Sequence, residues 1–217
     1  PAGGRPGLVH VGPVLPATPA PAPAPVEADP APPPGAEPMV LVSLSTFHFP
    51  GMAQCLQAIL DACAALDARV VATTGPVVDP GDLRPPANAQ VLRFVPHAEL
   101  MPRATLMVGH GGHGSTMQAL AHDLPMVLMP MHPLVDQPMV ARSVEDAGAG
   151  RVVRKKATAD ELRPVIESLL ADGPHRAAAR ALGAQVRQLD GAGGAADRIE
   201  GLVAGGAHPG LRPATRP

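Results

Sequence analysis

The segment His110–Thr116 has the residue types and spacing of an anion-binding turn. Three glycines, including Gly112, remove side chains and allow a backbone to approach a ligand closely. A predicted helix starts at Ser115–Thr116, so its unpaired N–H groups and positive dipole end would face the same space. His110 could donate a further hydrogen bond, and the arrangement suits a phosphate or diphosphate. The alternative is a glycine-rich turn followed by a Ser/Thr helix cap.

A second candidate pair is Asp136–Gln137, which follows the apolar run PMVLMP. A carboxylate beside an amide supplies both acceptors and donors for sugar hydroxyls. The alternative is an Asp helix cap next to a solvated Gln.

Two further segments end predicted strands. Phe94, one of three aromatic residues in the chain, could stack on a nucleotide base, although an isolated Phe more often fills a core. The hydroxyls of Ser43, Ser45 and Thr46 could meet the same phosphates, although they could equally form an ordinary polar turn.

The sequence predicts no metal site. His110 and His113 span a strand–helix junction, and there is no helical HExxH pair. Cys55 and Cys63 would lie about 12 Å apart in one helix, too far to bridge. They are predicted to be free, buried thiols in a reducing cytoplasm.

Short apolar runs alternate with helical patterns, which predicts a Rossmann-like α/β fold with a parallel sheet flanked by helices. Such sheets bind ligands at the carboxyl ends of their strands, where the segments above lie. The predicted strands are 39–44, 68–74, 91–95, 105–110, 125–130 and 151–153. The predicted helices are 52–66, a short helix or turn over 97–103, 114–122, 134–147 and three segments within 158–204.

The chain divides into three parts. Residues 1–38 are predicted to be the end of an upstream domain, with a short β-like run (LVHVGPVLP), followed by a Pro/Ala-rich linker. Residues 39–204 form the folded domain, and 205–217 a flexible tail. A net charge of −2 without a basic stripe argues against nucleic-acid or anionic-membrane partners. No apolar run reaches the length of a membrane span, and no signal peptide is visible.

Taken in order, these motifs resemble the C-terminal domain of family 1 glycosyltransferases, which include macrolide glycosyltransferases and UDP-glucosyl and glucuronosyl transferases. The resemblance covers about Met39 to Val203. It implies a two-domain GT-B fold in which this half binds most of a nucleoside-diphosphate sugar, without a cofactor or metal. On this match the residues implied at the diphosphate are His110, Gly112, Ser115 and Thr116.

Other roles follow from the same resemblance. Phe94 would stack on the base and the Val95 backbone would pair with it, within a segment ending at His97. Asp136 and Gln137 match the acid–Gln pair that binds the sugar. Gln118 stands where many members have a Glu that holds the ribose.

Two departures concern the rest of the site. The segment between Pro130 and Asp136 is about two residues longer than usual. The acceptor pocket and the general-base His belong to the family's N-terminal domain, so no catalytic base is assigned here.

The resemblance implies an inverting, metal-independent transfer of a sugar from a UDP- or dTDP-sugar to a hydroxyl of a small hydrophobic acceptor. Two alternatives stay open. One is a non-catalytic module that binds the nucleotide sugar. The other is a different GT-B enzyme, such as a lipid-linked sugar transferase or a sugar-nucleotide epimerase.

Overall fold

The computed structural model describes residues 9–15 and 38–205. The predicted Pro/Ala-rich linker, apart from its last residue, and the predicted tail after residue 205 lie outside the described residues.

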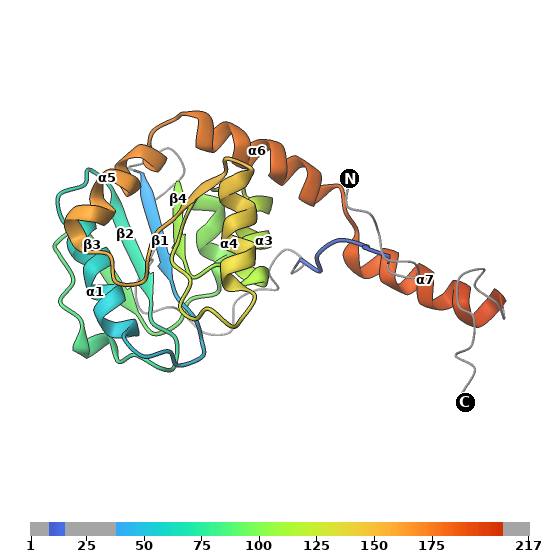
Figure 1. Cartoon of the computed structure of the whole chain (residues 1–217), viewed down its shortest axis with the longest axis horizontal. Coiled ribbons are helices and arrows are strands. Elements are labelled where there is room, and N and C mark those ends of the chain that lie inside the picture. The colour runs from blue at the N-terminus through green and yellow to red at the C-terminus, as the bar shows by residue number, and fades with distance from the viewer. Residues whose placement is uncertain (1–8, 16–37, 206–217) are drawn as a thin grey trace.

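Within the described residues, six strands form one sheet in the order β3-β2-β1-β4-β5-β6 (Figure 1). They are β1 (Met39–Ser43), β2 (Arg69–Thr73), β3 (Ala89–Leu92), β4 (Leu106–Gly109), β5 (Met126–Leu128) and β6 (Gly150–Val152). Every neighbouring pair is parallel, which confirms the predicted sheet. The chain fills one side of β1 and then crosses to β4, so the strand order reverses between β1 and β4. The carboxyl ends of strands at such a reversal form the crevice in which doubly wound sheets bind ligands.

Helices cover both faces of the sheet (Figure 1). They are α1 (Met52–Cys63), α2 (His97–Leu100), α3 (His113–Ala121), α4 (Gln137–Asp146), α5 (Ala159–Leu170), α6 (Pro174–Arg187) and α7 (Gly191–Gly205). Short 3-10 turns occupy Pro80–Asp82 and Met101–Arg103.

Successive residues of the central strands belong to two different cores. Val40 and Val42 of β1 pack into the cluster that contains α1 and α5. Met39 and Leu41 pack into the cluster that contains α2, α3, α4 and α6. Because side chains alternate across a strand, a sheet covered on both faces requires uninterrupted apolar strands, and β1 (MVLVS) is buried throughout.

The last helix lies outside these two layers. In Figure 1, α7 extends away from the sheet, and residues 9–15 run beside its start. Gly12 contacts the side chain of Leu189, and Gly191 lies against the backbone of Pro13. The predicted β-like run is wrong for the described residues 9–15, which form no strand. Gly12 adopts a φ of 98°, which is incompatible with a strand, and the prolines remove backbone donors.

Three predicted boundaries are also wrong. The third strand ends at Leu92 rather than Val95, because β2, its partner, ends at Thr73. The helix predicted over 52–66 ends at Cys63. The helix predicted from Leu134 starts at Gln137, with Pro138 in its first turn, where a missing N–H costs no helical bond.

Candidate functional site

A cleft of about 820 Å³ opens at the carboxyl ends of the strands, where the strand order reverses. Loops after β1, β2, β3, β4 and β5 all contribute to its wall. The structure brings together ten of the sequence-predicted site residues in this wall: Ser45, Thr46, Phe94, Val95, His110, Gly112, Ser115, Gln118, Asp136 and Gln137.

The N-terminus of α3 opens into this cleft without a side-chain cap. Gly112 is the N-cap residue and its carbonyl accepts from the Thr116 amide at 3.0 Å. The Ser115 hydroxyl donates to the same carbonyl at 3.1 Å instead of capping the helix. The first-turn N–H groups before Thr116 therefore lack helical acceptors. The Ser/Thr-cap interpretation of this segment is wrong.

The glycines of this turn allow close packing around the helix start. Gly111 has a φ of 81°, and a Cβ there would lie 3.0 Å from the Gln137 carbonyl oxygen. A Cβ on Gly112 would lie 2.5 Å from Nε2 of His110. Only glycine at 112 therefore lets the His110 ring lie directly against the start of α3.

His110 is partly buried, and its neighbours Asp136 and His97 shift its pKa in opposite directions. Burial lowers its pKa most, the Asp136 carboxylate raises it, and His97 lowers it. The Ser43 backbone carbonyl also raises the pKa, although the buried Nδ1 makes no hydrogen bond of standard geometry within the described residues. An anion at the start of α3 would add a further negative charge and would raise the pKa of His110 again.

Thr116 does not line the cleft. It is 1% exposed and lies in the first turn of α3. A contact between Thr116 and a diphosphate stays a prediction, although the buried position of its side chain does not favour it.

In the loop after β3, the Phe94 side chain is exposed and the Val95 side chain is buried. The Phe94 side chain is 74% exposed and lines the cleft, whereas Val95 is 1% exposed. The core-filling alternative for Phe94 is therefore wrong. Val95 anchors the loop, which leaves the Phe94 ring accessible to a flat ligand group.

The structure does not show the alternative in which the Asp136 side chain caps a helix and Gln137 is solvated. Asp136 is the N-cap residue of α4 but makes no side-chain cap bond, so its carboxylate is available. Gln137 is 5% exposed rather than solvated, and its Oε1 accepts from the Met131 amide at 2.8 Å. The Gln137 amide can therefore offer a ligand its N–H groups.

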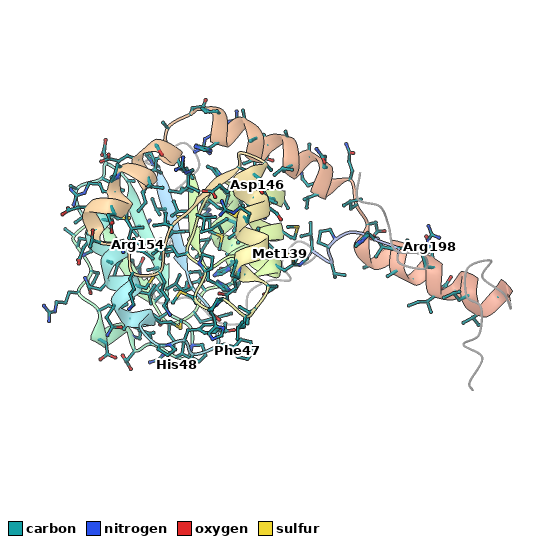
Figure 2. All side chains as sticks on the ribbon, in the orientation of Figure 1. Phe47, His48, Met139, Asp146, Arg154 and Arg198 are labelled. Atoms are coloured by element: carbon teal, nitrogen blue, oxygen red, sulfur yellow. The ribbon has the colours of Figure 1, made fainter. Side chains whose placement is uncertain are left out.

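The loop after β1 forms the opposite wall. The Ser45 hydroxyl accepts from the Phe47 amide at 3.0 Å, as expected for a polar turn, and Thr46 follows it in the cleft wall. Figure 2 shows Phe47 and His48 at the lower edge of the body, whereas Asp146 lies at the far end of α4. Phe47 is 76% exposed.

Sequence reasoning missed four polar residues of the wall: His48 in the loop after β1, Thr73 at the end of β2, Arg93 after β3, and a role for His97 at the start of α2. Arg93 forms an exposed ion pair with Asp79 at 3.0 Å. The signal for Thr73 was available, because it ends a strand as Ser43 does. No sequence signal marked Arg93, because its position in the cleft wall depends on where β3 ends.

In the part of the chain that the structure describes, no group of three His, Cys, Asp or Glu side chains is placed to hold a metal ion. Likewise, none of the helices in residues 38–205 is both long and apolar enough to span a membrane. Cys55 and Cys63 are free and buried as predicted, and burial raises their pKa values to about 11 and about 12.

Comparisons with known proteins identify the family of this chain. Residues 57–188 match the family model described as "Erythromycin biosynthesis protein CIII-like, C-terminal domain". The chain is 33% identical over 171 residues to demethyllactenocin mycarosyltransferase of Streptomyces fradiae, covering 76% of this chain and 36% of that protein. It is 38% identical over 144 residues to 4'-demethylrebeccamycin synthase of Lentzea aerocolonigenes, covering 65% of this chain and 33% of that protein.

Solved structures give the same result. The calicheamicin glycosyltransferase CalG4 superimposes with a TM-score of 0.74 at 27% identity, over 89% of this chain and 46% of that one. The glycosyltransferase of kitacinnamycin gives 0.68 at 30% identity, over 82% and 46%. The chain thus spans less than half the length of these relatives. It belongs to the erythromycin biosynthesis protein CIII-like C-terminal domain family, the C-terminal half of GT-B glycosyltransferases of family 1.

Proposed function

We propose that this chain is the donor-binding part of a glycosyltransferase and that its cleft holds a UDP- or dTDP-sugar. The observation that carries the proposal is the meeting of an uncapped helix start, two glycines and His110 at the strand reversal. Unpaired N–H groups, the positive end of the α3 dipole and an imidazole converge on one point, and a diphosphate matches that set.

The other walls fit the remaining parts of such a donor. The exposed Phe94 ring would stack on the base, with the Val95 backbone pairing beside it. Gln118 would bond the ribose without a charge. Asp136 would accept from sugar hydroxyls and the Gln137 amide would donate to them. Ser45, Thr46 and the Ser115 hydroxyl would border the diphosphate.

The reaction would be an inverting transfer in which the nucleoside diphosphate leaves. His110 and the start of α3 would stabilise the negative charge that develops on the leaving group, so a metal ion is not required. The small hydrophobic acceptor and the general base would come from the remaining part of the enzyme. The VinC glycosyltransferase, 26% identical to this chain, has a solved structure in complex with DTDP, and this likeness supports a nucleotide as the ligand of the chain. The two free, buried thiols fit a reducing cytoplasm.

Two other functions use the same cleft. A non-catalytic module would bind the same donor without transfer, and only the full-length protein distinguishes it. An epimerase would need acid–base carboxylates, whereas Asp136 is the one carboxylate in the cleft wall that the structure describes. A lipid-linked sugar transferase would share the donor site and differ in the acceptor.

The test is calorimetric titration of this chain with UDP, dTDP, uridine and thymidine. We expect the diphosphates to bind more tightly than the nucleosides, and weakly overall because the cleft is open to water. The chain alone should transfer no sugar from a UDP- or dTDP-sugar. Absence of diphosphate binding would refute the donor site, and transfer by the isolated chain would refute the assignment of the general base elsewhere.

A further inference from the structure

The loop after β5, residues 129–136, is held at Met131 from two sides. Met131 is 2% exposed, and its N–H donates to Oε1 of Gln137 at 2.8 Å. Its carbonyl accepts from Nζ of Lys155 at 3.0 Å. These two groups belong to the peptide units before and after Met131, so both units are fixed. The loop is thereby joined to the first residue of α4 and to the segment after β6.

The chemistry of these groups fixes the direction of both hydrogen bonds. A backbone N–H and a protonated lysine can only donate, and a carbonyl oxygen can only accept. The atom of the Gln137 amide that faces Met131 is therefore Oε1, and Nε2 is directed away from that contact. Within the described residues Nε2 has no hydrogen-bond partner, and it is not among the fully enclosed atoms that lack one. Since Gln137 lines the cleft, its side-chain N–H groups are available to a ligand there.

Lys155 is placed for this contact by its own turn. The Ala157 amide donates to the Arg154 carbonyl at 3.0 Å, which closes a turn around Lys155, and Thr158 then caps α5. Within the described residues the Lys155 ammonium forms no ion pair with a carboxylate, and its hydrogen bond instead reaches a residue 24 positions earlier. The neighbouring Lys156 is exposed and makes neither kind of contact in the part of the chain that the structure describes. The two lysines therefore share one turn but differ in what they contact.

We propose that Lys155 is a positioning residue for the donor sugar: by holding the Met131 carbonyl, it keeps the loop after β5 where Gln137 directs its amide N–H groups into the cleft. The inference rests on the proposed function, since it needs a nucleotide sugar in this cleft. Lys155 does not line the cleft, so its effect passes through Met131 and Gln137. Without the ammonium, the bond to Oε1 of Gln137 alone would hold the loop at Met131, and the orientation of the Gln137 amide would be less fixed.

The chain offers a matched pair of lysines for the test. Lys155→Met removes the ammonium and keeps an unbranched side chain, whereas Lys155→Arg keeps a charged donor. Lys156→Met is the control, because it removes the same charge from the next residue of the turn. The readout is the ratio of two dissociation constants from calorimetry, that of UDP-glucose divided by that of UDP, and likewise for dTDP-glucose and dTDP. Only the first ligand of each pair carries a sugar, so the ratio isolates the contacts of the sugar.

We expect Lys155→Met to raise this ratio about three- to tenfold, the usual effect of one neutral hydrogen bond, here the bond from Gln137 to the sugar. Lys156→Met should leave the ratio within about twofold of the parent, and Lys155→Arg should restore most of the loss. Gln137→Leu should raise the ratio by itself. Lys155→Met should then raise it by about twofold or less in the Gln137→Leu background, because both changes remove the same contact.

A measurement without ligand tests the positioning directly. The Met131 amide donates to Gln137, so its hydrogen exchange reports how often the loop opens. We expect this amide to exchange about three- to tenfold faster in Lys155→Met than in the parent, the change that follows from the loss of one hydrogen bond. The amide of Val42, a fully buried residue of the central strand β1, should change little. Lys156→Met should match the parent at both amides.

Three results would overturn the inference. They are an unchanged ratio in Lys155→Met, an equal change in Lys155→Met and Lys156→Met, and an equal acceleration of the Met131 and Val42 amides. The third result would show a loss of overall stability instead of a loss of loop position. Failure of the parent to bind UDP, dTDP or either nucleotide sugar would overturn the proposed function, and exchange at Met131 would still decide whether Lys155 holds the loop.

Discussion

Replacement of Phe94 by alanine separates the binding role of this residue from a packing role. The Phe94 side chain is 74% exposed, so its truncation removes few contacts within the fold. We expect the free energy of unfolding to change by about 0.5 kcal/mol or less, as at other surface positions. A core Phe would lose about 3–5 kcal/mol. Base stacking on an aromatic side chain contributes about 1–3 kcal/mol, so affinity for UDP or dTDP should fall about five- to 150-fold.

The assay combines urea denaturation with calorimetric titration of the parent and Phe94→Ala. Phe47→Ala is a matched control, because Phe47 lines the same cleft and is 76% exposed, but lies on the wall formed by the β1–α1 loop. It should leave base binding nearly unchanged. A Phe94→Ala variant that binds nucleotide normally would refute the stacking role. A large drop in its stability would show that exposure underestimates the packing of this ring.

Two other predictions concern the histidines. His110→Ala should weaken UDP binding about ten- to a hundredfold, because a charge-assisted hydrogen bond contributes about 1.5–3 kcal/mol. Uridine binding should barely change, because uridine lacks the anion. Calorimetric titration checks this, and equal losses for both ligands would mean that His110 supports the fold. Stability should decrease as the pH falls below about 6.5, because burial lowers the pKa values of His97, His110 and His122 and the unfolded chain therefore takes up protons first. The loss in the free energy of unfolding is at most about 1.4 kcal/mol per pH unit for each histidine, and it should be smaller in His97→Gln. Urea denaturation at pH 7.5 and 5.5 checks this. A free energy of unfolding that does not change between these pH values would contradict it.

The sequence predicted a parallel sheet but not the order of its strands. Apolar runs such as MVLVS at β1 indicate burial on both faces, and burial on both faces indicates a parallel sheet. The reversal between β1 and β4 depends instead on which face each connecting helix covers, and no single run of sequence records that. The position of the cleft follows from this reversal, so the sequence indicated the loops but not their meeting point.

The same holds for individual residues of the site, because some could be predicted from the sequence and others could not. Gly111 and Gly112 were predictable, because the anion site predicted at this helix start needs a close backbone. The burial of Thr116 was not, since it depends on how α3 packs in the fold. The contact between Thr73 and His97 could not be predicted either, because the two residues lie 24 positions apart and only the fold brings them together.

The distribution of aromatic residues bears on the same site. The chain has three Phe and neither Trp nor Tyr, so aromatic rings are scarce and the core consists of aliphatic side chains and Met. All three, Phe47, Phe49 and Phe94, line the one cleft at the strand reversal. Leaving two of them about three-quarters exposed forgoes the burial that makes a Phe stabilising, roughly 1.5–3 kcal/mol for each ring. Core packing therefore does not explain the positions of Phe47 and Phe94, whereas Phe49 packs against the core cluster that contains α1. For Phe94, the flat group of a bound nucleotide would cover the ring when it fills the cleft.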